Sequence, residues 1–156
     1  MLRLRLATQE DCDLLFEWAN DIECRKNSFS QKKIDYDTHV RWFRAHLQDE
    51  KSDLFLAVED SVEIGMLRLD YEQNQALISY SVAAKERKKE YGKKILQLAE
   101  IYVRNEKEHI QILTGKVKND NVISMHIFEE LGYEKQECED YIQYTKSYLN
   151  ECFSKA

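Results

Sequence analysis

A basic turn in the middle of the chain combines residue types and spacing that point to chemistry. A β-like segment ending at Val82 leads through a lysine-rich turn into an amphipathic helix, which carries Ile95 and Leu98 on one face. A helix N-terminus has unpaired backbone N–H groups and about half a positive charge, so it can bind a pyrophosphate without dedicated side chains. The pattern therefore predicts a phosphate site. Its candidate residues are Val82, Arg87, Lys88, Lys89, Glu90, Tyr91, Gly92 and Lys93.

This turn resembles the acetyl-CoA loop of the GNAT N-acetyltransferase superfamily. In that family an apolar strand ends at a Val, and five residues later a Gln/Arg-x-x-Gly-x-Gly/Ala turn opens the long central helix. Val82, Arg87 and Gly92 fall on this spacing, whereas Glu90 stands where the family usually has a glycine. The resemblance implies acetyl-CoA as the co-substrate and no metal.

A second signature lies further along the chain, at residues 121–124 (N-V-I-S) and 131–133 (L-G-Y). It is similar to the family's N-x-x-S/A helix that ends in Gly-Phe/Tyr, and the resemblance implies cofactor contacts for Asn121 and Ser124. The usual proton donor of the family is a Tyr seven residues after the Asn, and this chain has Phe128 there. The remaining candidates for the donor are Tyr133, Tyr80 and a water molecule.

The first half of the chain resembles one variant of the family, through the pattern W-x-N-D…R-x-N-S…H-x-x-W-F. This variant is found in acetyltransferases of bacterial nucleotide-sugar pathways, of the pseudaminic acid type, which acetylate a nucleotide-linked amino sugar. Such an acceptor needs aromatic faces for stacking, short polar groups for hydroxyls and a guanidinium for phosphate. The predicted acceptor residues are Trp18, Asn20, Arg25, Ser28, His39, Trp42 and Asp70.

Acetyl transfer from a thioester to an amine needs a neutral amine, a donor for the oxyanion and a proton for the leaving thiolate. His39 is the best predicted proton acceptor, because a histidine titrates near neutral pH. Backbone N–H groups around Ser81 and Val82 are the predicted oxyanion donors. Tyr133 completes the predicted catalytic set.

Each of these residues also has a purely structural interpretation. Trp18 and Trp42 lie on amphipathic helices and are typical of a packed core. His39 lies one helical turn before Phe43, which suits a packing histidine equally well. Asp70 shares one face of its strand with Arg68 and is a candidate for an ion pair. The lysines of the basic turn are also common at a solvated helix start.

The elements that must position these residues follow from hydrophobic periodicity. Helices are expected after Thr8, after Asp35, after the basic turn and after Asn121, and residues 20–34 look irregular. The order β-α-α-β-β-β-α-β-α-β-β predicts a mixed α/β sheet, and it is also the order of the GNAT fold. We expect a mostly antiparallel sheet flanked by helices, and the resemblance implies a central splay between the strand that ends at Val82 and the strand that starts near Ile110. Strands are expected at residues 2–6, 54–58, 62–69, 76–82, 110–117, 133–135 and 141–146.

Length and composition restrict the class of protein. A chain of 156 residues with 43% hydrophobic and 33% charged residues is typical of one globular domain, expected at residues 1–146 with a tail at 147–156. Neither a signal peptide nor a membrane span is evident, so a cytoplasmic location is expected. The net charge of −6 argues against nucleic-acid binding. The scattered cysteines are expected to be free thiols.

Three functions remain open from the sequence. The first is an acetyl-CoA-dependent N-acetyltransferase acting on a small amine, the amino group of a nucleotide-linked amino sugar. The second is a protein N-terminal acetyltransferase of the ribosomal-protein type, or an aminoglycoside acetyltransferase, because an acidic surface suits a cationic acceptor. The third is a degenerate, non-catalytic CoA-binding module, suggested by Glu90 and Phe128. A monomer or a homodimer is expected.

Overall fold

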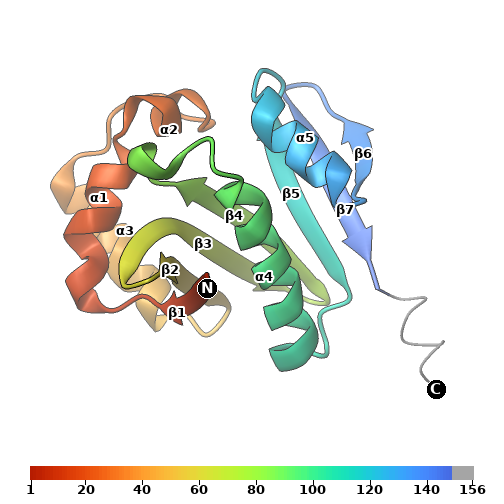
Figure 1. Cartoon of the computed structure of the whole chain (residues 1–156), viewed down its shortest axis with the longest axis horizontal. Helices are drawn as coiled ribbons and strands as arrows, with labels where there is room; N and C mark the ends of the chain where they lie inside the picture. Colours follow the sequence, from red (N-terminus) through yellow and green to blue (C-terminus); the bar gives the residue numbers. More distant parts are fainter. Residues whose placement is uncertain (149–156) are drawn as a thin grey trace.

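The computed structural model describes residues 1–148 and forms a seven-stranded sheet in the order β1-β2-β3-β4-β5-β7-β6 (Figure 1). All neighbouring strands are antiparallel except β4 and β5, which are parallel. The predicted mixed α/β sheet is therefore confirmed. The strands are β1 (Arg3–Leu6), β2 (Ser52–Glu59), β3 (Val62–Glu72), β4 (Gln75–Val82), β5 (Ile112–Lys118), β6 (Glu134–Glu137) and β7 (Tyr141–Ser147).

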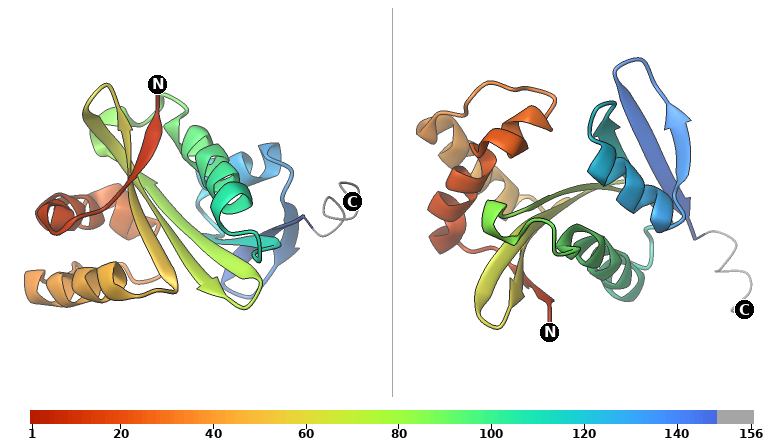
Figure 2. Two further views of the ribbon diagram at one scale, coloured as in Figure 1. Left: turned by 90° about the horizontal axis from the view of Figure 1, so that it is seen from below. Right: turned by 45° about the horizontal axis from the view of Figure 1, so that its top comes forward.

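Two layers of helices cover the sheet, one on each face (Figure 2). The helices α1 and α3 pack on the face of β1 to β3, where Leu15, Phe43 and Leu56 are buried together. The helices α4 and α5 pack on the opposite face, and there Ile95 and Phe128 belong to the larger core. The helices are α1 (Cys12–Ala19), α2 (Ile22–Lys26), α3 (Tyr36–Gln48), α4 (Tyr91–Glu106) and α5 (Val122–Glu130), with short 3-10 turns at Gln9–Asp11 and Ala84–Glu86.

The sheet opens between β4 and β5, as expected. These strands pair only from Gln75 and Ile112 to Ile78 and Gly115. Beyond this point β4 continues to Val82, still paired with β3, while β5 continues to Lys118 paired with β7. The upper ends of the two strands consequently diverge, and Figure 1 shows the opening between β4 and β5.

Short polar residues begin the helices and turn the hairpins. Asp35 accepts a hydrogen bond from the Thr38 N–H and caps α3, as side-chain oxygens do at a helix N-terminus. Asp60 and Ser61 join β2 to β3 with φ of 51° and 69°, the handedness that suits a tight hairpin. Both features agree with the predicted turns.

The largest differences from the sequence prediction lie in the segment between α1 and α3 and at the C-terminus. Residues 20–34 contain the short helix α2, which Asp21 caps by accepting from the Cys24 N–H. Ser147, assigned to the tail, ends β7, and Tyr148 is buried. The rest of the expected tail lies outside the described residues. Among the described residues, no helix has the length and apolar character needed to cross a membrane.

Candidate active site

The turn before α4 has the backbone conformation expected of a glycine-rich loop. Lys88 and Glu90 have φ of 69° and 63°, in the left-handed region that glycine occupies at least cost. Glu90 is the N-cap residue of α4, but its side chain makes no capping hydrogen bond. The first backbone N–H groups of the helix, at Tyr91, Gly92 and Lys93, have no intrahelical acceptor. This helix terminus is therefore suited to an anion.

The guanidinium of Arg87 contacts a residue outside the basic turn. Its Nη2 donates to Oδ2 of Asp21 at 2.5 Å, and Asp21 also caps α2 through the Cys24 N–H. Burial acts to raise the pKa of Asp21, but the hydrogen bonds from Arg87 and Cys24 outweigh it, and the net shift is downward. Arg87, which was predicted to bind phosphate, therefore links the basic turn to α2 through its hydrogen bond to Asp21.

The lysines of the turn differ in how far they are engaged. Lys89 pairs with Glu86 at 3.0 Å, and Lys93 pairs with Glu130 of α5 at 3.0 Å. Lys88 is exposed. Each of these ammonium groups lies on the surface beside the uncapped end of α4, where it strengthens the local positive potential.

The open edge of β4 presents backbone groups to the gap. The Ala83 N–H donates to the Ile64 carbonyl of β3, and hydrogen-bonded pairs alternate along an antiparallel ladder. The backbone groups of Ser81 consequently face β3, whereas those of Tyr80 and Val82 face the gap. The predicted oxyanion donor at Val82 is well oriented. The same prediction for Ser81 is corrected, because its N–H belongs to the β3–β4 ladder.

Tyr80 reaches from β4 across the gap to α5. Its hydroxyl and the Ser124 Oγ share a hydrogen bond at 2.8 Å, and burial raises the pKa of the Tyr80 phenol. A Cβ on Gly92 would lie only 3.3 Å from the Tyr80 ring and 3.0 Å from Ile127, so glycine allows α4 to approach closely. Asn121 caps α5 by accepting from the Ser124 N–H at 3.3 Å. The signature residues Asn121 and Ser124 thus position α5 and Tyr80.

Phe128 occupies a packed position beside β5. It is 2% exposed, stacks on Tyr144 at 5.2 Å between centroids, and leaves no room for a side chain at Gly115. A proton donor is therefore absent from this part of α5.

Tyr133 lies at the closed end of the sheet rather than at the gap. Its ring packs edge-on against Phe128, and the Lys146 ammonium lies 5.4 Å above it. Lys146 pairs with Leu113, near the start of β5, where β4 and β5 are still joined. Tyr133 is 5% exposed, and burial raises the pKa of its hydroxyl. The prediction of Tyr133 as a catalytic residue is corrected, because its side chain is enclosed in the core.

Arg25 holds the segment between α2 and α3. Its Nε donates to the Ala19 carbonyl at 2.6 Å, and its Nη1 donates to the carbonyls of Ser30 and Lys32 at 3.1 and 3.2 Å. Its Nη2 donates to Ser28 Oγ at 3.1 Å. A guanidinium has five N–H donors, and these contacts use most of them.

Asn20 closes the same segment by exchanging two hydrogen bonds with the backbone of Ile34, at 2.9 and 2.8 Å. Trp18 is partly buried against the core formed by α1, α3 and β2. The predicted acceptor contacts of Asn20, Arg25 and Ser28 are corrected accordingly. Their polar groups are used to fix a loop of the chain itself.

His39 is also part of the packing between helices. Its Nε2 lies 2.9 Å from the Cys12 carbonyl, and since a carbonyl only accepts, Nε2 carries the proton. The ring is 2% exposed and lies among Phe16, Trp42 and Phe43. An acceptor amine has no access to it. The prediction of His39 as the catalytic base is corrected for this reason.

Trp42 and Asp70 both contact Arg68, in a polar cluster below α3. The Arg68 Nε donates to Asp70 at 2.9 Å, its Nη2 donates to Ser79 Oγ at 3.2 Å, and its guanidinium lies 5.4 Å above the Trp42 ring. His46 lies 3.6 Å from Asp70. The predicted ion pair of Arg68 and Asp70 is confirmed, and the cluster faces the same side of β4 as Ser79.

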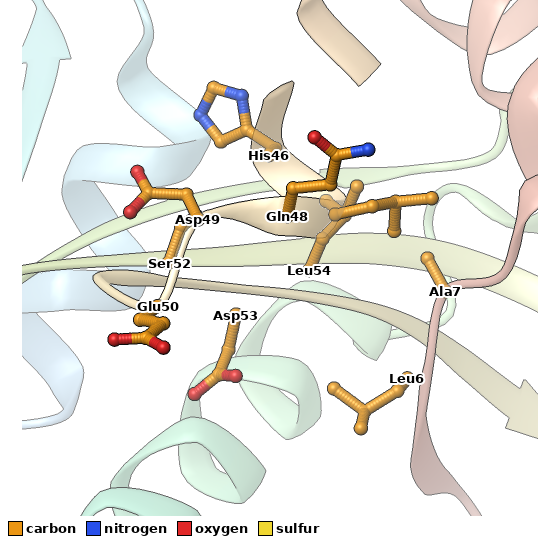
Figure 3. Close-up of a pocket in the computed structure, with 10 residues that line it drawn as sticks. Leu6, Ala7, His46, Gln48, Asp49, Glu50, Ser52, Asp53 and Leu54 are labelled. Carbon is orange, nitrogen blue, oxygen red and sulfur yellow. The ribbon is translucent and has the colours of Figure 1, made fainter. Parts of the chain in front are cut away.

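Two cavities lie away from the gap. One, of about 260 Å³, opens between the end of α3 and the start of β2, near His46, Asp49 and Glu50 (Figure 3). Asp53 contributes to its wall, although its carboxylate also accepts from the Tyr71 hydroxyl. The other, of about 540 Å³, lies between α1 and α3. Neither cavity contains a residue of the basic turn.

Sequence reasoning missed the positioning role of Asp21. A signal for this role was present in the sequence, since Asp21 is the last residue of the W-x-N-D pattern and directly precedes the short helix α2. Its partner in the basic turn lies far away in sequence, and no local pattern indicates such a contact. Tyr80 was one of several candidates, and only the fold distinguishes it from Tyr133.

The sheet is thus open between two parallel strands, and an uncapped helix N-terminus lies beside the opening. The sequence matches the family model described as an acetyltransferase (GNAT) domain over residues 1–134. The chain therefore belongs to the GNAT acetyltransferase family, and the predicted enzyme class, an N-acetyltransferase that uses acetyl-CoA, is confirmed at family level.

Solved structures share the fold at low sequence identity. Spermidine N-acetyltransferase from Vibrio cholerae, in complex with CoA and spermine, has a TM-score of 0.85 and 16% identity, covering 94% of this chain and 95% of that chain. The aminoglycoside acetyltransferase AAC(6')-Ib with coenzyme A has a TM-score of 0.84 and 15% identity, with both chains fully covered. RimL, a ribosomal L7/L12 α-N-protein acetyltransferase, has a TM-score of 0.80 and 16% identity, covering 94% and 93%. No curated protein sequence matches the chain.

Proposed function

We propose that this protein transfers the acetyl group of acetyl-CoA to the amino group of a small, nucleotide-linked amino sugar. The observation that carries the transferase assignment is the uncapped N-terminus of α4 beside the open edge of β4. The N–H groups of Tyr91, Gly92 and Lys93 are suited to a pyrophosphate. The backbone groups of Tyr80 and Val82 are suited to an extended chain that adds to β4 in the gap.

The chemistry needs few side chains once the reactants are oriented. The amine nitrogen attacks the thioester carbonyl, and the Val82 N–H stabilises the oxygen on which negative charge develops. The attacking nitrogen carries a positive charge after the attack and releases one proton to solvent. Collapse of the tetrahedral intermediate then breaks the carbon–sulfur bond and leaves an amide and a thiolate. The Tyr80 hydroxyl is the proposed proton donor to that thiolate, because a phenol is protonated at neutral pH, and burial raises the pKa of this one further. Solvent then returns a proton to the phenolate.

The amine is proposed to enter in its neutral form. With His39 enclosed between α1 and α3, no histidine of the predicted set can receive its proton. The rate should therefore follow the free-amine fraction, and it should rise with pH until the pKa of the acceptor is passed. Orientation alone can supply most of the rate enhancement of such a reaction.

The acceptors named for the similar structures differ from one another. They are spermidine, aminoglycosides and a ribosomal protein. The resemblance to nucleotide-sugar acetyltransferases favours an anionic acceptor instead. The cytoplasmic location and the monomer or homodimer remain predictions.

The proposal is tested by release of free CoA with a panel of acceptors at one concentration. The panel contains a UDP-linked 4-amino sugar, spermidine, kanamycin and an L7/L12 N-terminal peptide. Turnover of the UDP-linked amine at least tenfold above the others is the expected result. Calorimetric titration with acetyl-CoA provides the control, because absence of binding would identify a degenerate module and contradict the proposal as a whole.

A further inference from the structure

One face of the sheet is covered over only half of its width. The helix α3 lies over β2, and among the described residues no helix covers the same face of β5 and β7 (Figure 2). Leu113 and Val117 of β5 point into the core beneath α4 and α5. Side chains alternate along a strand, so Thr114, Lys116 and Lys118 point to the opposite face, where Thr114 is buried and Lys116 is exposed. This uncovered part of β5 and β7 is called the open face below.

The open face is basic, in contrast to the net charge of −6 of the whole chain. Lys116 is exposed, and its ammonium lies 5.5 Å from the Tyr141 ring. The Lys118 ammonium lies 2.7 Å from the Lys26 carbonyl, which accepts its hydrogen bond. Residues two apart on a strand are separated by about 7 Å, which is a distance that a diphosphate can span. Lys116 and Lys118 therefore form a pair suited to an anion of this length.

Aromatic rings stand beside these lysines. Phe29, which belongs to the segment between α2 and α3, is 60% exposed and packs edge-on against Tyr141 with centroids 6.0 Å apart. Tyr141 is paired with Lys118, at the end of β5 that diverges from β4. An exposed phenylalanine ring held in place by a second ring offers a surface on which a planar base can stack.

We infer that the open face binds the acceptor and that it accepts an amine linked to a nucleoside diphosphate. The base stacks on Phe29, the diphosphate lies along Lys116 and Lys118, and the amine reaches the gap between β4 and β5. This inference rests on the proposed function, which it deepens by assigning residues to the acceptor. Polycationic amines are repelled by the same lysines, in contrast to the spermine bound in one structure of similar fold.

Binding to the CoA-saturated protein tests the inference, because CoA then occupies the site at α4 and nucleotides cannot compete for it. Uridine diphosphate should bind, and spermine should not. Lys116→Glu should weaken uridine diphosphate binding at least tenfold. Lys135→Glu is the matched control, since Lys135 pairs with Tyr144 and therefore faces the opposite side of the sheet. It should change binding by less than about twofold.

Inorganic pyrophosphate, which has no base, tests the contacts of the phosphates separately from the contacts of the base. Phe29→Ala should weaken uridine diphosphate binding and leave pyrophosphate binding unchanged. Equal effects of Lys116→Glu and Lys135→Glu, tighter binding of spermine than of uridine diphosphate, or no binding of uridine diphosphate would each overturn the inference. Titration of the free protein with acetyl-CoA distinguishes the failures. Protein that binds acetyl-CoA but not uridine diphosphate contradicts only the acceptor, whereas protein that does not bind acetyl-CoA contradicts the proposed function.

Discussion

Arg87 and Asp21, which are 66 positions apart in the sequence, are joined by a hydrogen bond of 2.5 Å between Nη2 and Oδ2. The bond connects the turn before α4 with the cap of α2. The part of the chain that is proposed to hold the pyrophosphate is thereby fixed to the segment that borders the acceptor. A change at this pair should therefore affect both substrates.

Asp21→Ala should raise the KM for acetyl-CoA and for the acceptor together, each by several-fold. It removes the α2 cap, which is worth about 1 kcal/mol, and frees the Arg87 guanidinium. Steady-state kinetics with each substrate varied in turn gives the two constants. Glu23→Ala, in the same helix and exposed, is the control and should leave both unchanged. An effect on one substrate alone would contradict the coupling.

Glu90→Gly should tighten acetyl-CoA binding by a few-fold. The substitution relieves a left-handed backbone conformation, worth about 1 kcal/mol or more, and removes a negative charge beside the proposed pyrophosphate site. Calorimetric titration measures the dissociation constant. Asp60→Gly is the matched control, because Asp60 is also acidic with positive φ but lies in the β2–β3 hairpin. If both variants, or neither, change the affinity, the local role of Glu90 is refuted.

Tyr80→Phe should lower kcat by about 100-fold, within the range that general acid catalysis supplies. The KM for acetyl-CoA should stay within about threefold, because the ring and its packing against Gly92 are kept. Tyr133→Phe is the control, since it removes a phenol hydroxyl from the closed end of the sheet. A kcat for Tyr80→Phe equal to that of wild type would show that water protonates the thiolate.

His39→Ala should reduce stability rather than catalysis. The imidazole fills a buried space among three aromatic rings and donates to the Cys12 carbonyl, so its removal should cost about 2 to 4 kcal/mol. Chemical denaturation measures this loss. The kcat of the folded fraction, determined well below the melting temperature, should match wild type at every pH. A kcat loss that disappears at high pH would instead restore His39 as a base.

Acid should destabilise the protein through Asp11. Arg5 donates to both carboxylate oxygens, at 2.8 and 2.9 Å, and this lowers the pKa of Asp11 despite the opposing effect of burial. A carboxyl whose pKa is lower in the folded than in the unfolded state stabilises the fold at pH values above its unfolded-state pKa, which is about 3.9 for Asp. This contribution is lost as the pH falls through the folded-state pKa.

The free energy of unfolding, measured from pH 7 to pH 2, should therefore fall below about pH 4 in the wild type. Asp11→Asn should be less stable at pH 7, by about 1 to 3 kcal/mol, and should show a weaker fall on acidification. Identical pH profiles for the two proteins would indicate that other carboxyl groups carry the effect.

The order of helices and strands along the chain was predictable because its signals are local. The Val82 and Gly92 spacing, the helix after Asp35 and the capping Asn121 each depend on neighbours in sequence. The acceptor side was not predictable in the same way. Arg25, Asn20 and His39 have side chains equally suited to ligands and to backbone carbonyls, and only the folded chain shows that carbonyls of Ala19, Ile34 and Cys12 are their partners.

The short pairing of β4 with β5 gives the sheet a free edge in its interior. Edge strands at the rim of a sheet are exposed to other chains, and proteins commonly protect them. Here the edge of β4 beyond Ile78 faces the opening between β4 and β5. The co-substrate is proposed to lie against this edge as an added strand would, so we expect its binding to stabilise the fold as well as to supply the acetyl group.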